Sequence, residues 1–434
     1  MTIKVACVRR PDAVYSPRVS IANVSRAAVA IALVAGFLAC WTSSFAQLET
    51  KVELGIDRLL REAPELVLGK RLGLITNPTG MTGDFRSTVD ALHRDDRFQL
   101  TALYGPEHGV RGDIFAGKKI SDYIDSETGL PVYSLYGKTF KPTPEMLVNV
   151  DILLFNIQDI GIRPYTYIYT MSRAMEAAKE QNIPFVVLDR PNPLGGTLVE
   201  GAVLKPEFKS GIGLYPIPYI HGMTVGELAK LFNEEFEINC ELTIVPMKNW
   251  RRNMIFQETG LTWIPTSPHV PHPETCFYIA ATGGFGELET LSPGVGTPQP
   301  FELCGAPWID GENLANVMNE LDLPGVYFRP LFFRPYYLRF VQERCGGVQL
   351  HIRDYKKFKP IDTEIRLLAA IRDLFPEHDY FDESNRTASF DRAYGTDQVR
   401  KALIAGKSAD EILASWQEEL EEFMKVRQKY LIYD

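Results

Sequence analysis

Short apolar segments rich in β-branched residues recur between residues 66 and 250, and segments of helical periodicity separate them. This alternation is typical of β-α units around a largely parallel sheet. The expected strands are Arg71 to Thr76, Gln99 to Tyr104, Asp151 to Asn156, Phe185 to Leu188 and Leu242 to Pro246. The expected helices are Phe85 to Arg94, Pro144 to Val150, Thr170 to Gln181 and Thr224 to Phe236, the last beginning with a capping box of Thr224 and Glu227. We therefore predict an α/β sheet domain over residues 47–250.

The regularity fades after residue 250. The Pro- and Gly-rich stretch from Ile264 to Pro307 predicts long loops. Beyond it, Gly347 to Arg353 alternates like a strand and Ile361 to Leu374 fits a helix. Ser408 is a capping residue before one long amphipathic helix that reaches Tyr430. We expect a second, smaller α+β domain over residues 251–434.

The first 46 residues have the layout of a secretory signal peptide. Five basic residues precede an uncharged apolar segment, Ala27 to Trp41, and Ser44, Phe45 and Ala46 follow it. The segment is shorter than the ~20 apolar residues of a membrane span. We predict cleavage near Ala46 and a periplasmic or secreted protein without a membrane anchor. The alternatives are an uncleaved helix and lipidation at Cys40.

Charge and cysteine content narrow the possible functions. Removing residues 1–46 takes away five basic residues and one acidic residue, so the formal net charge moves from −9 to −13. An acidic protein of this kind is not expected to bind nucleic acid. Beyond the leader, Cys240, Cys276, Cys304 and Cys345 lack the spacing of a zinc site, and the pattern leaves their disulfide status open.

Polar clusters directly follow four of the predicted strands, at residues 77–80, 105–109, 158–159 and 189–193. Because the carboxyl ends of parallel strands form the binding crevice of an open sheet, we expect these loops to converge. Glu107 lies in a loop of glycine and proline beside His108, where a carboxyl group can act as a general acid. The alternative is a glutamate that only holds the turn.

Further candidates suit the recognition of a sugar, since carboxylates and amides bind hydroxyls, aromatic rings cover pyranose faces and arginine binds carboxylates. Asp159 is the second catalytic candidate, after Glu107 and His108. The substrate-binding candidates are Asn77, Arg111, Gln158, Arg163, Tyr165, Tyr167, Asp189, Arg190 and Asn192. Alternatively, Tyr165 and Tyr167 belong to the core, Arg163 pairs with Asp159, and Asp189 forms an internal salt bridge with Arg190.

Seven segments resemble the NamZ-type exo-β-N-acetylmuramidases, a family formerly known as a domain of unknown function. They are GLITNPTG (73–80), YGPEHGVRGD (104–113), DILLFNIQDIGIRPYTYIYTM (151–171), VVLDRPNPLGG (186–196), PFELCGAPW (300–308), CGGVQLHI (345–352) and FDRAYGTDQVRKALIAGKSADEI (390–412). The resemblance implies a Rossmann-like first domain, a smaller second domain and a cleft that accepts a muramyl sugar. It also implies that Glu107 is the catalytic glutamate, assisted by His108 and Asp159. From their charge, we add Arg163 and Arg190 as candidates for holding the lactyl carboxylate.

One loop departs from the family pattern. Relatives typically carry SEGRGT followed by TRPFE, whereas residues 292–302 here read SPGVGTPQPFE, so one carboxylate and two arginines are missing. The preceding stretch, residues 282–291, diverges too.

The function that these observations predict is an exported glycoside hydrolase without a cofactor. It would release MurNAc from the non-reducing end of peptidoglycan fragments, its muramyl substrates. A non-catalytic sugar-binding protein is one alternative, prompted by the altered loop at residues 282–299. A metal-dependent hydrolase or esterase, with Glu107, His108, Asp159 and Asp189 as ligands, is the other.

Overall fold

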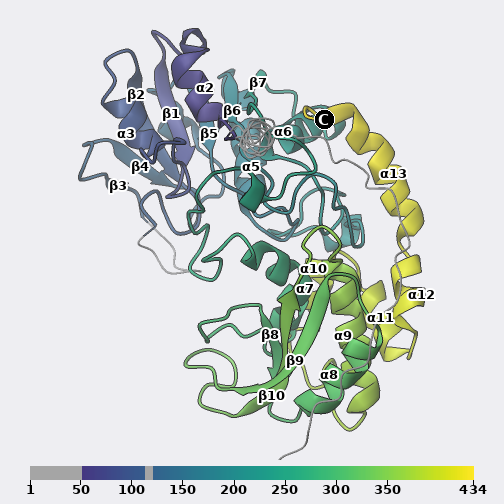
Figure 1. Cartoon of the computed structure of the whole chain (residues 1–434). Coiled ribbons are helices and arrows are strands. Elements are labelled where there is room, and N and C mark those ends of the chain that lie inside the picture. Colours follow the sequence, from purple (N-terminus) through teal and green to yellow (C-terminus); the bar gives the residue numbers. More distant parts are fainter. Residues whose placement is uncertain (1–50, 113–120) are drawn as a thin grey trace, which may run out of the picture. The chain divides into compact units, whose positions relative to one another are not determined.

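A seven-stranded sheet, the large sheet, is built from the first half of the residues that the computed structural model describes, 51–112 and 121–434 (Figure 1). Its strands are β1 (Arg71–Thr76), β2 (Gln99–Gly105), β3 (Tyr123–Ile124), β4 (Pro131–Ser134), β5 (Ile152–Asn156), β6 (Phe185–Leu188) and β7 (Leu242–Val245). The strand order is β3-β4-β2-β1-β5-β6-β7, and only the β3-β4 pair is antiparallel. The chain moves outward from β1 in one direction and from β5 in the other. The topological switch point of this Rossmann-like sheet therefore lies between β1 and β5.

Helices cover both faces of the large sheet, and the side-chain alternation of the strands explains how. The helices are α2 (Gly55–Arg61), α3 (Thr88–His93), α4 (Pro144–Leu147), α5 (Tyr167–Gln181) and α6 (Val225–Glu235). In β5, Leu153 and Phe155 pack with α5 and α6, whereas Leu154 packs with α2 and α3. Each such fully buried side chain stabilises the fold by roughly 1.5–3 kcal/mol. The parallel sheet is therefore apolar on both faces.

The five strands predicted in this half are confirmed to within a residue or two. The capping box of α6 is confirmed as well, because Thr224 Oγ1 accepts a 3.2 Å hydrogen bond from the Glu227 amide and Glu227 accepts one from the Thr224 amide. Helix α5 begins at Tyr167, three residues before the predicted start. The short strands β3 and β4 were not predicted.

The second half contains a three-stranded antiparallel sheet among the described residues, the small sheet, with order β8-β10-β9. Its strands are β8 (Leu303–Ala306), β9 (Val326–Phe333) and β10 (Cys345–Ile352), and its helices are α7 (Thr275–Leu288), α8 (Gly311–Glu320) and α9 (Pro360–Leu374). Helix α7 lies in the stretch predicted to be loops, so that prediction is wrong. Most of its residues are buried, and a helix buried on nearly all sides lacks the amphipathic period that identifies a helix in sequence.

The single helix predicted from Ser408 to Tyr430 is also wrong. Two α-helices occupy this region, α12 (Ala409–Ala414) and α13 (Gln417–Arg427), after the preceding helices α10 (Thr387–Tyr394) and α11 (Gln398–Ile404). Ser408 does cap α12, but the helix ends at Ala414. Trp416 packs into the core of the small sheet, whereas Phe423 packs into the core of the large sheet. The chain breaks between α12 and α13 because the two halves of the segment contribute to different cores.

The remaining helical turns in the described residues are η1 (Pro64–Leu66), η2 (Pro206–Phe208), η3 (Phe256–Glu258) and η4 (Gln428–Tyr430). Lys51–Asp434 forms one compact unit, and the predicted division near residue 250 stays a prediction. Within the described ranges, no helix combines the length and the apolar composition needed to cross a bilayer. The predicted signal peptide lies outside the described residues.

Candidate active site

The loops that follow β1, β5 and β6 are joined by hydrogen bonds, which confirms the predicted convergence for three of the four strand-end clusters. Asn77 Oδ1 accepts a 3.0 Å hydrogen bond from the Thr79 amide, and Thr79 Oγ1 accepts a 2.8 Å bond from the Gln158 amide. Gln158 Nε2 donates to the Pro191 carbonyl at 2.7 Å. All three side chains are buried. Asn77 and Gln158 therefore fix the rim of the crevice at the switch point.

Arg190 and Asn192 also form hydrogen bonds to the loops at the crevice rim. Arg190 Nη1 donates to the Met81 carbonyl and to Asn156 Oδ1, both at 3.0 Å. Burial lowers the pKa of Arg190 to about 10, which leaves the guanidinium charged at neutral pH. Asn192 Nδ2 donates to the Met223 carbonyl at 3.0 Å. Binding of a substrate carboxylate by Arg190 stays a prediction, since the guanidinium already holds three loops together.

Asp189 is fully buried and accepts four hydrogen bonds. The donors to its carboxylate are the amides of Arg190 and Gly226 and the hydroxyls of Thr224 and Tyr433, at 2.6–2.9 Å. Burial raises the pKa of Asp189 to about 6, although these donors oppose the shift. The carboxylate thus ties the start of α6 and the end of the chain to β6, which is a structural role.

Glu107 follows β2 in a tight turn. The Gly109 amide donates to the Pro106 carbonyl at 3.0 Å, and both His108 (φ 72°) and Gly109 (φ 75°) lie in the left-handed region. A non-glycine residue in that region is uncommon and is held there by its surroundings. The turn leaves the Glu107 side chain half-buried.

Two tyrosines from other segments flank Glu107. Tyr136, which follows β4, forms a side-chain hydrogen bond with Glu107, and burial together with the Glu107 charge raises the pKa of the Tyr136 hydroxyl. Tyr167 at the start of α5 is buried, and its pKa is raised first by burial and further by the charges of Tyr165 and Glu107. Both phenols therefore stay protonated at neutral pH beside the carboxyl group.

His108 faces residues from the second half of the chain. The pKa of His269 is lowered by burial and by the nearby His108. His269 Nε2 in turn lies 3.0 Å from the Tyr337 hydroxyl, which belongs to the segment after β9. The segment around His269 therefore reaches the loop that carries Glu107.

Asp159 lies deeper than Glu107 and contacts His221. Its Oδ2 accepts a 2.8 Å hydrogen bond from the Gly161 amide and lies 3.9 Å from His221 Nε2, whereas Oδ1 is a buried oxygen without a partner in the described residues. Burial raises the pKa of Asp159 to about 7 and lowers that of His221 to about 3. The side chain is thus placed to shape the β5 loop.

The guanidinium groups of the two remaining arginine candidates are already bonded to other residues of the chain. Arg111 forms a bidentate ion pair with Asp125, at 2.8 and 2.9 Å, which lowers the pKa of Asp125 to about 2. Arg163 is fully buried, and its Nη2 donates to the Ala393 carbonyl at 2.7 Å. Substrate binding by either residue stays a prediction.

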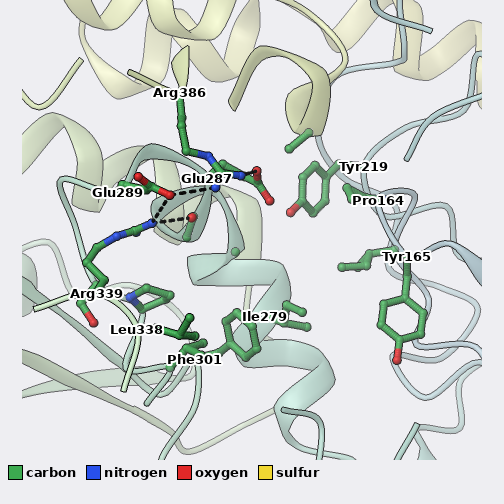
Figure 2. A pocket seen from close by; sticks show the side chains of 17 residues that line it. Pro164, Tyr165, Tyr219, Ile279, Glu287, Glu289, Phe301, Leu338, Arg339 and Arg386 are labelled. Carbon is green, nitrogen blue, oxygen red and sulfur yellow. Dashed lines mark hydrogen bonds and ion pairs between the residues drawn. The ribbon is translucent and has the colours of Figure 1, made fainter. Parts of the chain in front are cut away.

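Tyr165 and Tyr167 lie under the segment that precedes α7. Their rings meet edge to face at 4.9 Å, and their hydroxyls donate to Thr266, to Oγ1 at 3.0 Å and to the carbonyl at 2.7 Å respectively. Tyr165 also lines a pocket of about 640 Å³, which we call the Tyr165 pocket (Figure 2). Its other walls come from Tyr219, α7 and the segments around Ser292 and Arg339. The altered loop thus borders a pocket beside the site.

The candidates from the sequence did not include Tyr136, Tyr219, Thr266, His269 or Tyr337. Tyr136 follows a parallel strand, so recognising β4 would have identified it by the same strand-end rule. The others come from segments without a regular period, and only the fold brings them to the crevice. Among residues 51–112 and 121–434, no group of three His, Cys, Asp or Glu side chains has the arrangement of a metal site.

Comparison with known proteins identifies the family. Models described as exo-β-N-acetylmuramidase NamZ match residues 72–274 for the N-terminal part and 278–433 for the C-terminal part. The peptidoglycan β-N-acetylmuramidase NamZ of Bacillus subtilis (strain 168) is 52% identical over 383 residues, which cover 88% of this chain and 92% of the relative.

Two crystal structures of DUF1343 family proteins from Bacteroides fragilis are similar in fold. The first has a TM-score of 0.84 at 43% identity and covers 88% of this chain and 99% of that chain. The second has a TM-score of 0.74 at 32% identity and covers 89% and 99%. The chain therefore belongs to the NamZ family of exo-β-N-acetylmuramidases and is a glycoside hydrolase.

Proposed function

We propose that this chain is an exported exo-β-N-acetylmuramidase that removes MurNAc from the non-reducing end of peptidoglycan fragments, with Glu107 as its general acid. The observation that carries the proposal is the position of Glu107. It lies at the carboxyl edge of the large sheet, in the turn after β2, the neighbour of β1 at the switch point, and it is half-buried beside Tyr136 and near Tyr167. The name of the Bacillus relative and the family model support the substrate.

In this mechanism the Glu107 carboxyl group donates its proton to the oxygen that links MurNAc C1 to the next sugar. The C1–O bond breaks, the leaving sugar departs with a hydroxyl group, and water adds to C1 with loss of one proton, which restores the protonated Glu107 carboxyl group by way of solvent. The Tyr136 hydroxyl holds the carboxyl group in position, because it remains protonated and bonds to Glu107. His108 borders the reacting bond from the same turn, and Asp159 acts as a positioning residue for the β5 loop.

The test is incubation of residues 47–434 and of the Glu107→Gln variant with a MurNAc-GlcNAc disaccharide, followed by mass spectrometry. Glutamine keeps the size of the side chain but has no proton to donate. Free MurNAc from the unaltered protein, with a loss of at least ~100-fold in the variant, is the expected result. Equal release by both proteins would rule out Glu107 as the acid. Sugar binding without release by either protein would favour the non-catalytic alternative.

Metal analysis of the same protein tests the other alternative. Activity that survives prolonged treatment with a chelator is expected for the general-acid mechanism, because no step uses an ion. Activity that disappears on chelation and returns with one divalent cation would favour a metal-dependent hydrolase.

Export is tested separately. Signal-peptide cleavage near Ala46 predicts that the protein isolated from the periplasm or the culture medium begins at about Gln47. Amino-terminal sequencing or intact-mass measurement gives the answer. A protein that begins at Met1 in the cytoplasm would overturn export, and a lipid-modified Cys40 would replace it with membrane anchoring.

A further inference from the structure

The Tyr165 pocket is separated from the Glu107 loop by the side chains of Tyr165 and Tyr167. Tyr165 lines the pocket, and its ring centroid lies 4.9 Å from that of Tyr167. The charge of Glu107 contributes to the raised pKa of Tyr167. The pocket volume of about 640 Å³ is within the ~300–1,000 Å³ range of small-molecule sites. The pocket therefore begins beside the tyrosine pair of the candidate site.

The pocket combines apolar surface with a few polar groups, which suits a saccharide. Ile279, Phe301 and Leu338 form an apolar side, and the hydroxyl of Tyr219 points into the space from the opposite wall (Figure 2). Burial and the charges of Glu364 and Glu287 raise the pKa of Tyr219, so the hydroxyl remains a donor. Sugar rings present C–H faces to apolar walls and hydroxyls to groups of this kind.

The charged residues of the pocket already pair with one another. Arg386 lies 2.8 Å from Glu289 and 3.6 Å from Glu287, and Glu287 also accepts a 2.5 Å hydrogen bond from the Ser389 hydroxyl. Arg339 donates to the carbonyls of Phe285 and Gly286 in the last turn of α7 and of Leu291 just beyond it, at 2.6–3.2 Å. A charged ligand would have to disrupt these pairs, whereas a neutral ligand can add hydrogen bonds to them.

The altered loop makes this pocket less polar. Ser292, Pro293 and Val295 line it, and the last two stand where the family pattern has glutamate and arginine. Gly296 (φ 96°) accepts a 2.7 Å hydrogen bond from the Tyr336 amide, and a Cβ atom there would lie 2.3 Å from the Tyr337 carbonyl oxygen. The loop is thus fixed against the segment that carries Tyr337.

We propose that the Tyr165 pocket binds the neutral acetamido sugar, a GlcNAc unit, that leaves when MurNAc is released. This inference rests on the proposed muramidase function and names a second part of the same site. Phe301 and Leu338 contact the ring, and Tyr219 with the Glu287 carboxylate binds its polar groups. The altered loop then sets the preference for an uncharged leaving group.

The test compares two substrates that share MurNAc but differ in the leaving group, MurNAc-GlcNAc and para-nitrophenyl MurNAc. Val295→Trp fills the pocket, and Glu287→Gln removes the carboxylate while keeping the shape. Each variant should lower the ratio of kcat/KM for the disaccharide to that for the aryl glycoside by about tenfold, mainly through KM. Val148→Trp, at a position that is 70% exposed on the large-sheet half, is the matched control and should leave the ratio unchanged.

The outcomes separate this proposal from its competitors. An unchanged ratio in a folded Val295→Trp protein would overturn it, and so would an unchanged ratio in Glu287→Gln if the tryptophan variant fails to fold. A loss confined to peptide-bearing muramyl substrates would assign the pocket to the peptide instead. If the unaltered protein cleaves neither substrate, the proposed function fails by itself. GlcNAc titration of the Glu107→Gln protein, with and without Val295→Trp, then tests the pocket alone, and equal binding would reject it.

Discussion

The hydroxyl of Tyr433 donates a 2.6 Å hydrogen bond to the buried carboxylate of Asp189, and the same hydroxyl accepts a 2.8 Å bond from the Met247 amide. The final segment of the chain therefore closes over the large sheet at β6 and β7. Asp189 also holds the start of α6, so this bond links three elements through one buried group.

Tyr433→Phe should lower the free energy of unfolding by about 1–3 kcal/mol, because it leaves a buried carboxylate and a backbone amide each short of one partner. Urea unfolding followed by circular dichroism measures the loss. Tyr336→Phe, with a side chain 71% exposed, is the matched control. Equal unfolding midpoints for the two variants would contradict a structural role for the bond.

Asp159 predicts a pH-dependent contribution to stability. Burial raises its pKa from an ordinary 3.8 to about 7, so the folded state favours the protonated form. A carboxyl group of this kind stabilises the fold fully below its ordinary pKa, and that contribution disappears as the pH rises through the folded pKa. The window therefore runs from about pH 4 to about pH 7.

Asparagine at this position does not titrate. The stability of Asp159→Asn relative to the unaltered protein should rise by on the order of a few kcal/mol between about pH 5 and about pH 8. Urea unfolding at the two pH values measures the change, and the exposed Asp96→Asn is the control. A difference independent of pH would mean that Asp159 is ionised throughout this range.

The burial of the cysteine thiols predicts that they do not react in the folded protein. The cysteines of the described residues, Cys240, Cys276, Cys304 and Cys345, are all buried and unpaired. Burial raises the pKa of Cys240 and Cys345 to about 11 and that of the other two further. Because the thiolate is the reactive form, residues 47–434 should not react with a thiol reagent until urea unfolds them. A thiol that titrates in the native protein would contradict this arrangement.

The fold of the first half could be predicted because its strands and helices have clear periods. Strand β5 is a continuous apolar segment, and Thr224 with Glu227 forms a cap that is readable in sequence. Helix α7 was missed because most of its residues are buried, so its sequence shows no polar face. Gly283, Gly284 and Gly286 also lower its helix propensity. The break between α12 and α13 at Trp416 arises because Trp416 and Phe423 pack into different cores. The local sequence pattern does not show into which core a residue packs.

The candidate site shows the same limit. Glu107 and the convergence of the loops follow from position after strands, because parallel strands end at one edge. The difference between Asp189, which is saturated by four donors, and Glu107, which is half-buried beside tyrosines, depends on contacts from Tyr433, Tyr136 and Tyr167. These partners come from distant segments, so charge and spacing alone placed both carboxylates in the candidate site, Glu107 as the acid and Asp189 as a substrate-binding residue.

A substitution of Tyr136 tests the role of Glu107 as the general acid while leaving Glu107 itself unchanged. Its hydroxyl bonds to Glu107, so Tyr136→Phe should leave the carboxyl group in place but poorly held. We expect kcat on MurNAc-GlcNAc to fall by about tenfold with little change in KM, because the hydroxyl positions the acid and does not bind the sugar. Tyr327→Phe, on the small sheet and 40% exposed, is the matched control. A rise in KM at constant kcat would instead make Tyr136 a sugar-binding residue, and unchanged kinetics would mean that Glu107 needs no support from this side.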